Sequence, residues 1–352
     1  MNIALTYNMI RKKILKNRPV DAIAELDSKE TIDALKDAIE KNGHDVVLVE
    51  ADEEAYLKLK NLKNKIDLVF NIAEGISGES RESYIPFMCE MLGIPYTGSS
   101  PSALAICLNK ARTKEILMHY NIATPKFQIF NGENEKLNEN ITYPLILKLK
   151  DEGSKMGLTK SSVVRNDAEL KKQLTYLFET YNKPVMAEEF LIGREFTVGV
   201  IGNDDPITFP PVEVKFSEQL KETERVVLFQ ADDPVVSMIK SVDKNFSNSE
   251  KYVDYASVCP AGISKELESR LKETALKAYR TLRCRDWCRI DMRLDKNGKV
   301  NVLELNPIAG IDPSYWFPRA AKAAGMEYHQ LIGKIIDYAS ERYKIKRAVM
   351  AE

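Results

Sequence analysis

The sequence predicts an α/β protein with a doubly wound parallel sheet at its N-terminus and α+β organisation in the remainder. Two observations predict this fold class. Strand and helix signals alternate over residues 1–100, which is the pattern of parallel strands joined by crossover helices. Later strand signals lie close together, and one pair near the C-terminus is typical of a β-hairpin. A chain of 352 residues has room for two or three domains.

The N-terminal part alternates short apolar runs with amphipathic runs. The helix over residues 28–41 is the best bounded, because Ser28 can cap its start and Gly43 follows its end. The ligand crevice of such a sheet lies beyond the carboxyl ends of its strands, where residues 71–75 stand. The predicted strands cover residues 3–7, 45–49 and 67–71, and the predicted helices cover 28–41, 55–62 and 80–92.

A turn-rich run over residues 95–101 ends this part, and a smaller α+β region follows it. The polar run over about 216–255 has two open interpretations, a lid that orders over substrate or a mobile surface insertion. The predicted helices cover residues 109–120, 167–181, 264–282 and 328–342, and the predicted strands cover 126–130, 145–148, 163–164, 184–188 and 195–201.

The composition excludes several classes of protein. The net charge is −1 and no long block of one sign occurs, so nucleic acid is not expected as a partner. No apolar stretch approaches the roughly 18 residues that span a bilayer, so we expect a cytoplasmic protein with no membrane partner. The five cysteines are scattered without zinc-ligand spacing, and we expect them to be reduced.

The predicted hairpin carries a group of polar side chains. Asn297-Gly298 is a strong turn signal between two apolar-rich runs. Because side chains alternate faces along a strand, Arg289 shares a face with Asp291, and Glu304 shares a face with Asn306. Two carboxylates and an amide oxygen suit Mg²⁺. The alternative interpretation is an edge hairpin whose charged face is solvated.

Two further segments suit a nucleotide. The glycines and serine of residues 153–157 let main-chain N–H groups approach a phosphate, and Lys148 and Lys110 can add charge. A plain hairpin loop uses the same residues. The connector over 188–195 offers main-chain groups to an adenine and a carboxylate to a ribose, although an ordinary solvent-facing glutamate is more common than a ribose ligand.

Taken in order, these segments resemble the D-alanine–D-alanine ligases, members of the ATP-grasp superfamily. The resemblance covers nearly the whole chain. It implies a three-domain ATP-grasp fold, with a Rossmann-like domain over residues 1–106, a small central subdomain over 107–192, and a C-terminal subdomain over 193–352 that holds the lid. The segments that carry it are residues 93–99, 109–110, 152–154, 188–195, 259–261, 289–291, 304–306 and 317–321.

The resemblance implies roles for individual residues. Lys110 and Lys148 would contact ATP phosphates, Glu188 and Leu191 would face the adenine, and Glu195 the ribose. Two Mg²⁺ ions, or Mn²⁺ in their place, would be held by the hairpin, with Glu304 bridging. Arg289 and the N–H of Gly310 would stabilise an oxyanion. The implied ATP-binding residues are Lys110, Lys148, Gly153, Ser154, Gly157, Glu188, Glu189, Leu191 and Glu195, and the implied metal ligands are Asp291, Glu304 and Asn306.

The substrate end matches the family less closely. Glu25 would receive the ammonium of the first substrate, and Ser154 would orient it. The family has a His-Gly stretch where residues 71–75 stand here. By count from Gly310, Tyr315 occupies the place of the serine that binds the second carboxylate, with Ser314 one step away. In the lid, Tyr252 is the candidate for the family tyrosine.

The implied reaction has two steps. ATP phosphorylates a substrate carboxylate, and the amine of a second substrate then attacks the acyl phosphate. Three hypotheses follow: a D-alanine–D-alanine ligase of cell-wall (peptidoglycan) synthesis, a ligase for other amino acids or a peptide, and a nucleotide-binding protein without ligase activity. The family also suggests a homodimer.

Overall fold

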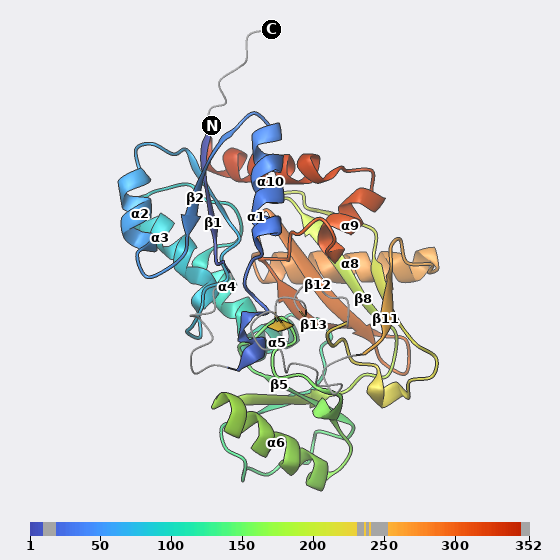
Figure 1. Cartoon of the computed structure of the whole chain (residues 1–352). Coiled ribbons are helices and arrows are strands. Elements are labelled where there is room, and N and C mark those ends of the chain that lie inside the picture. The colour runs from blue at the N-terminus through green and yellow to red at the C-terminus, as the bar shows by residue number, and fades with distance from the viewer. Residues whose placement is uncertain (10–18, 231–235, 237–238, 241–252, 346–352) are drawn as a thin grey trace.

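The structure is a computed structural model in which three β-sheets are surrounded by helices (Figure 1). It describes residues 1–9, 19–230, 236, 239–240 and 253–345. No helix within these ranges is long and apolar enough to cross a membrane. All five cysteines are free, as the sequence predicts.

The first sheet is parallel and has the strand order β2 (Asp45–Glu50), β1 (Asn2–Tyr7), β3 (Leu68–Asn71). Alternate residues of β1 face opposite sides, so Ile3 and Leu5 pack under one helix layer while Ala4 packs under the other. These helices confirm the doubly wound prediction. One layer is α1 (Lys29–Lys41) with α10 (Tyr328–Tyr343), and the other is α2 (Ala55–Leu62) with α3 (Tyr84–Leu92).

The end of this unit differs from the prediction in two places. The helix predicted over 80–92 is divided into a 3₁₀ turn, η3 (Arg81–Ser83), and α3. A further helix, α4 (Pro101–Leu108), was not predicted, because the run over 95–101 was interpreted as turns alone. Its signals are nonetheless present: the Ser100 hydroxyl accepts from the N–H of Ala103, and Pro101 occupies the first helical position.

The second sheet is antiparallel and lies at the lower end of Figure 1, in green. Helix α6 (Asp167–Tyr181), which was predicted with these bounds, covers one face through Leu170, Leu174 and Leu177. The preceding helix, α5 (Lys110–His119), is capped by the side chain of Asn109. The strand order is β4 (Phe127–Phe130), β7 (Val185–Glu189), β5 (Leu145–Leu149), β6 (Val163–Val164).

The third sheet carries the predicted hairpin, β12 (Trp287–Leu294) with β13 (Val300–Asn306), at one edge. Helix α8 (Lys265–Thr281) covers one face, and α9 (Trp316–Ala323) packs on the other. The remaining strands are β8 (Glu195–Ile201), β9 (Ile207–Thr208), β10 (Val212–Phe216) and β11 (Tyr255–Val258), all antiparallel to their neighbours.

The predicted lid of residues 216–255 is bounded by these strands. Phe216 of β10 pairs with Tyr255 of β11, so both ends of the run belong to the sheet. Val226, Leu228, Phe229 and Val253 inside the run are buried. In the described part, the run therefore packs on the protein, and the choice between a lid and a mobile surface insertion stays a prediction. Residues 231–235, 237–238 and 241–252 lie outside the described residues.

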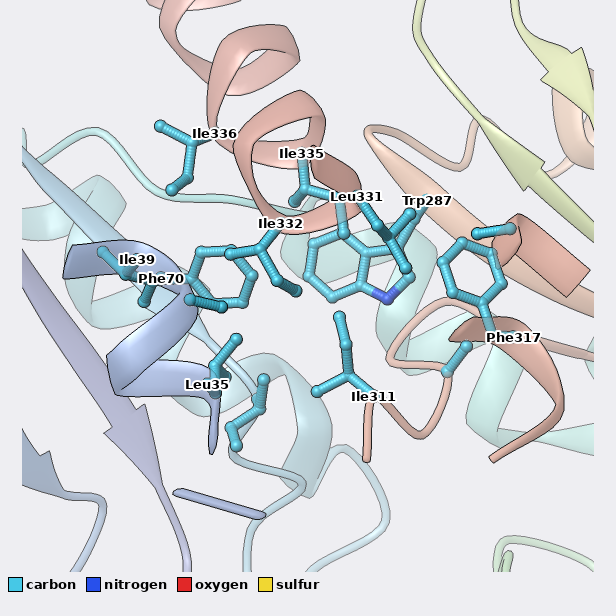
Figure 2. Close-up of a cluster of buried hydrophobic side chains, with 14 of the residues drawn as sticks. Leu35, Ile39, Phe70, Trp287, Ile311, Phe317, Leu331, Ile332, Ile335 and Ile336 are labelled. Atoms are coloured by element: carbon cyan, nitrogen blue, oxygen red, sulfur yellow. The ribbon is translucent and has the colours of Figure 1, made fainter. Parts of the chain in front are cut away.

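The first and third sheets share one hydrophobic core. Figure 2 shows Trp287, at the start of β12, between Phe70 of β3 and Phe317 of α9. The rings of Phe70 and Trp287 stack with centroids 5.9 Å apart. Each sheet lies within one of the three predicted segments, but α10 crosses back to cover the first sheet. The domain boundaries themselves stay a prediction.

A buried carboxylate beside this core joins the same two parts of the chain. The side chain of Asp286 is fully buried and accepts from the N–H of Gly98 at 2.6 Å. It also pairs with Arg342 of α10 at 2.8 Å and accepts from Asn203 at 2.9 Å. Its partners come from the N-terminal unit, the β8–β9 connection and the last helix.

Asp286→Asn should lower the free energy of unfolding by about 3–5 kcal/mol, because it leaves the Arg342 guanidinium without its buried partner. Asp205→Asn is the matched control, since that side chain is fully exposed, and it should change stability by less than about 0.5 kcal/mol. Urea denaturation at neutral pH measures both. Equal effects of the two substitutions would show that the Asp286 network does not stabilise the fold.

Candidate active site

One cavity of about 500 Å³ lies between the second and third sheets and the segment around Glu25. It collects nearly all of the predicted site residues. Tyr252 lies outside the described residues, and Gly157 is packed beneath the cavity against Leu149 and Leu177. The predicted residues in the lining are Glu25, Lys110, Lys148, Gly153, Ser154, Glu188, Glu189, Leu191, Glu195, Arg289, Asp291, Glu304, Asn306, Gly310, Ser314 and Tyr315.

The hairpin brings its polar side chains together as predicted. Arg289 lies opposite Asn306, and Asp291 lies opposite Glu304, with a bulge following Asp291. Arg289 donates two hydrogen bonds to Asp291, Nε to Oδ1 at 3.0 Å and Nη2 to Oδ2 at 2.9 Å. The Asn306 amide also donates to Asp291, at 3.0 Å. Burial opposes ionisation of Asp291, but the Arg289 guanidinium outweighs it and lowers the pKa of the carboxyl.

The residues of this hairpin fit a divalent cation of the magnesium type. No group of three His, Cys, Asp or Glu side chains in the described ranges could hold a metal by itself. The hairpin instead presents two carboxylates and one amide from adjacent strands. Mg²⁺ is usually bound by one or two carboxylates with water and phosphate oxygens completing the shell. Lys110 Nζ lies 3.4 Å from Glu304 and provides a local positive charge.

A buried ion triad lies beside the hairpin. The Glu188 carboxylate is 1% exposed and lies between Lys114, at 2.7 Å, and Lys148. Burial alone would raise the pKa of Glu188, but the two ammonium groups outweigh it and lower the pKa to about 2. The side chain of Glu188, the predicted adenine ligand, is therefore held by two lysines.

The predicted ribose ligand also has a cationic partner. Glu195 Oε2 pairs with Arg293 Nη1 at 3.1 Å. Arg293 is buried, lies over the ring of Phe190 at 4.5 Å, and donates to the main-chain oxygens of Gly193 and Arg225. Arg293 thus joins the connector over 188–195 to the described part of the lid.

The loop over residues 151–157 folds against the segment near η2 (Val20–Ile23). The Gly153 N–H donates to Glu25 Oε1 at 2.7 Å, and a Cβ at this position would lie at the same distance from that oxygen. A larger residue there would have to displace the Glu25 carboxylate. The Gly157 N–H donates to Asp21 Oδ2 at 3.1 Å. Ser154 and Lys155 both have positive φ, 46° and 64°, so the loop is held in a conformation that few side chains favour.

The Glu25 carboxylate lines the cavity but is already engaged. Its Oε2 accepts from Arg81 Nη2 at 2.6 Å and from Arg81 Nε at 3.1 Å. Arg81 is buried, pairs also with Glu152 at 3.1 Å, and donates to the carbonyl oxygen of Asp151. Arg81 therefore connects Glu25 to the loop over residues 151–157.

Three more carboxylates line the same end of the cavity. Burial raises the pKa of Asp27 to about 7 and that of Glu82 to about 8. Burial, together with Glu25 and Glu82, also raises the pKa of Glu74. Glu74 belongs to the segment 71–75 at the carboxyl end of β3, where the parallel sheet predicts a ligand crevice. This end of the cavity favours a positively charged group.

Another part of the cavity wall is formed by the loop after β13. Gly310 lies against the ring of Tyr315, because a Cβ on the glycine would lie 2.5 Å from Tyr315 Cδ2. The Ser314 hydroxyl donates to Asp312 Oδ1 at 2.6 Å, and Thr31 donates to Asp312 Oδ2 at 2.9 Å. Ser314 is thus tied to its own loop.

Comparison with known proteins identifies the family. The model of the "D-ala D-ala ligase C-terminus" family matches residues 116–337, which is more than half of the chain. The chain belongs to the D-alanine–D-alanine ligase family. It is therefore an ATP-dependent ligase that forms a C–N bond and releases ADP, and no comparison favours a nucleotide-binding protein without ligase activity.

Relatives match over most of the chain. An uncharacterized protein, y4sG, of Sinorhizobium fredii is 30% identical over 88% of this chain and 88% of its own. A D-alanine–D-alanine ligase of Carboxydothermus hydrogenoformans is also 30% identical, over 88% of this chain and 92% of its own. The crystal structure of the D-alanine–D-alanine ligase from Bacillus anthracis complexed with ATP superposes with a TM-score of 0.72, at 22% identity, covering 98% and 99% of the two chains. This superposition confirms the predicted ATP-grasp fold.

Sequence reasoning about this ligase missed several charged residues that define the cavity. Lys114 and Arg293 escaped notice because an isolated basic residue in a helix or strand carries no local signal. Arg81 lies within a predicted helix, and its sequence context likewise gives no sign of a role in the site. Each owes its role to a carboxylate far away in the chain, which only the folded structure brings near.

Glu188→Gln should make the free energy of unfolding depend less steeply on pH under acidic conditions. The folded-state pKa of Glu188, about 2, lies below its ordinary value of 4.5, so the ionised carboxylate stabilises the fold above pH 4.5. That stabilisation is lost as the pH falls from 4.5 toward 2. Over this window the free energy of unfolding should fall more steeply in the natural protein than in the variant.

Glu189→Gln is the matched control, because the neighbouring carboxylate accepts from Thr142 and faces neither lysine of the triad. It should retain the steep dependence on pH. Urea denaturation at a series of pH values measures all three proteins. A Glu188→Gln profile parallel to that of the natural protein would contradict the assigned triad.

Proposed function

We propose that the protein joins the carboxylate of one amino acid to the amine of a second through an acyl phosphate. The observation that carries this proposal is that one cavity holds cations suited to phosphate, hairpin carboxylates suited to Mg²⁺, and a carboxylate-rich end suited to an ammonium group. The C–N ligase chemistry of the family requires these three features in one place.

We assign the nucleotide to the region between the second and third sheets. Lys110 and Lys148 line the cavity beside the loop over 151–157, which supports contacts to phosphates. Glu188 and Leu191, with Glu189 beside them, would face the adenine, and Glu195 with Arg293 would face the ribose. Ser154 is exposed in the loop and free to approach a bound phosphate or the first substrate.

Asp291, Glu304 and Asn306 would hold two Mg²⁺ ions, and Mn²⁺ would fit the same oxygens. When bound, the ions would neutralise charge on phosphate oxygens. Arg289 is positioned to stabilise negative charge on the acyl group, and the Gly310 N–H lies on the same cavity wall. No side-chain nucleophile is needed, because holding both substrates together can lower the barrier by roughly 7–11 kcal/mol.

We place the donor amino acid at the Glu25 end. Glu25 accepts from Arg81 and Gly153, so it would share its charge with an incoming ammonium rather than offer a free carboxylate. Asp27, Glu74 and Glu82 lie in the same wall, and a bound ammonium would favour their ionised forms, which would then supply the remaining negative charge. The relatives named D-alanine–D-alanine ligase support D-alanine as the first substrate to test.

Three further features are carried from the sequence as proposals. The family resemblance supports a cytoplasmic homodimer that serves peptidoglycan synthesis. It also supports domain boundaries near residues 106 and 192. In agreement, each of the three sheets lies within one of these segments.

An amino-acid panel with ATP and Mg²⁺ tests the reaction. Phosphate release that depends on an added amino acid, with a dipeptide mass in the product, is expected. D-alanine dependence would assign the protein to D-alanine–D-alanine ligation. Release with another amino acid but not with D-alanine would assign the other-substrate hypothesis, and no release with any amine, including peptides, would contradict the proposal.

Glu304→Gln should lower Mg²⁺-dependent turnover by at least about 100-fold, beyond the 10–100-fold typical of residues that only support a metal ligand. It should also move the Mg²⁺ dependence of activity to higher concentration. Glu268→Gln, on the outer helix α8, is the control and should leave turnover unchanged. Near-natural turnover of Glu304→Gln would remove the metal assignment.

A further inference from the structure

An arginine to which the sequence resemblance gives no role lies in the cavity wall, beside the loop that follows β13. Arg319, on α9, lines the cavity and is half-buried. Its Nη1 donates to the Ser257 hydroxyl at 2.6 Å, and its Nη2 donates to the Ser257 carbonyl oxygen at 3.0 Å. Two contacts to one strand residue fix the plane of the guanidinium.

Arg319 differs from the other arginines of the lining in its charge balance. Arg289 pairs with Asp291, and Arg293 pairs with Glu195. Within the described part of the chain, Arg319 is bonded to serine oxygens and to no carboxylate. A half-buried guanidinium bound only by neutral oxygens retains its charge for an anion.

The position of Arg319 relative to the reacting centre follows from its helix. Trp316 lies three residues earlier on α9, so the two side chains are neighbours on the helix surface. The Arg289 guanidinium lies over the Trp316 ring, 5.6 Å from its centroid. The Tyr255 ring packs edge-on against the same Trp316 ring, with centroids 6.4 Å apart. Arg319 is thus the neighbour, on the helix surface, of Trp316, which contacts Arg289.

The residues at the family's serine position are already committed. The Tyr315 ring is packed over Gly310, and the Ser314 hydroxyl is bonded to Asp312. In these positions neither side chain takes the place of the family's serine hydroxyl, which is directed at the carboxylate of the second substrate. A carboxylate bound beside this loop would therefore need another hydrogen-bond donor. Arg319 lies on α9, the helix that follows the loop.

We propose that Arg319 binds the carboxylate of the acceptor amino acid and so selects acceptors that carry a free carboxylate. The inference rests on the proposed function. A guanidinium can make two parallel hydrogen bonds to a carboxylate, which fixes the acceptor with its amine toward the centre of the cavity. Arg319 is a specificity-determining residue and takes no part in proton or phosphoryl transfer.

The test compares each acceptor with its carboxamide. The probes are D-alanine with D-alaninamide and L-alanine with L-alaninamide, extended to any other amino acid that the panel shows to be a substrate. The donor amino acid is kept at fixed concentration, and the two products are separated by mass. The natural protein should prefer the acid over the amide by about 10- to 100-fold in kcat/KM.

Arg319→Met should abolish this preference by raising KM for the acid, while kcat/KM for the amide and KM for ATP stay unchanged. Arg319→Lys should retain part of the preference, since it keeps the charge but loses the paired donors. Lys322→Met, an exposed change in the last turn of α9, is the matched control and should behave as the natural protein.

The outcomes separate this inference from the proposed function. An acid-to-amide preference that survives in both Arg319 variants would overturn the inference and leave the ligase function intact. A raised KM for ATP in Arg319→Met would place the guanidinium at a phosphate and also overturn it. Absence of amino-acid-dependent turnover in the natural protein would instead overturn the proposed function.

Discussion

The ion triad of Glu188 fixes the two walls of the cavity relative to each other. Glu188 belongs to the second sheet, and Lys114 reaches it from α5. The Lys114 ammonium also donates to the Thr124 hydroxyl at 2.8 Å, and that hydroxyl donates to the Val302 carbonyl oxygen of β13 at 2.8 Å. A continuous path therefore runs from the second sheet to the hairpin of β12 and β13. Removal of one partner from a buried ion pair is strongly destabilising, so this path fixes the two walls relative to each other.

The same constraint recurs around the cavity. Arg81 binds Glu25 and Glu152, and Arg293 binds Glu195. In each case a carboxylate from one segment is neutralised by a cation from another. Segments that are distant in the sequence are thereby brought to one site, and the cost of burying each charge is offset only when the segments are correctly placed. The polar lining of the cavity therefore contributes to the specificity of the fold.

The sequence could predict the parts of this structure that depend on neighbours along the chain. The bounds of α6 follow from apolar periodicity and the Asn166 cap, and the facing of Asp291 and Glu304 follows from strand alternation and the Asn297-Gly298 turn. The partners of Glu25 and Glu195 could not be predicted, because Arg81 and Arg293 are 56 and 98 residues away from them in sequence. Helix α4 lies between these cases, since its cap and proline signals were present but were interpreted as turns.

The ion pairs also constrain how ligands enter the site. Arg289 already binds Asp291, and Lys110 already lies beside Glu304, so the predicted metal ligands are neutralised by cations of the chain itself. A metal that binds Asp291 and Glu304 would release Arg289 and Lys110 toward new anions. Those anions are the ones the reaction supplies, a phosphate and an oxygen of the acyl group. Under this assignment the two cations would change partners when a metal binds. Arg319, which in the described part of the chain is bonded to Ser257 oxygens, would lie outside this exchange.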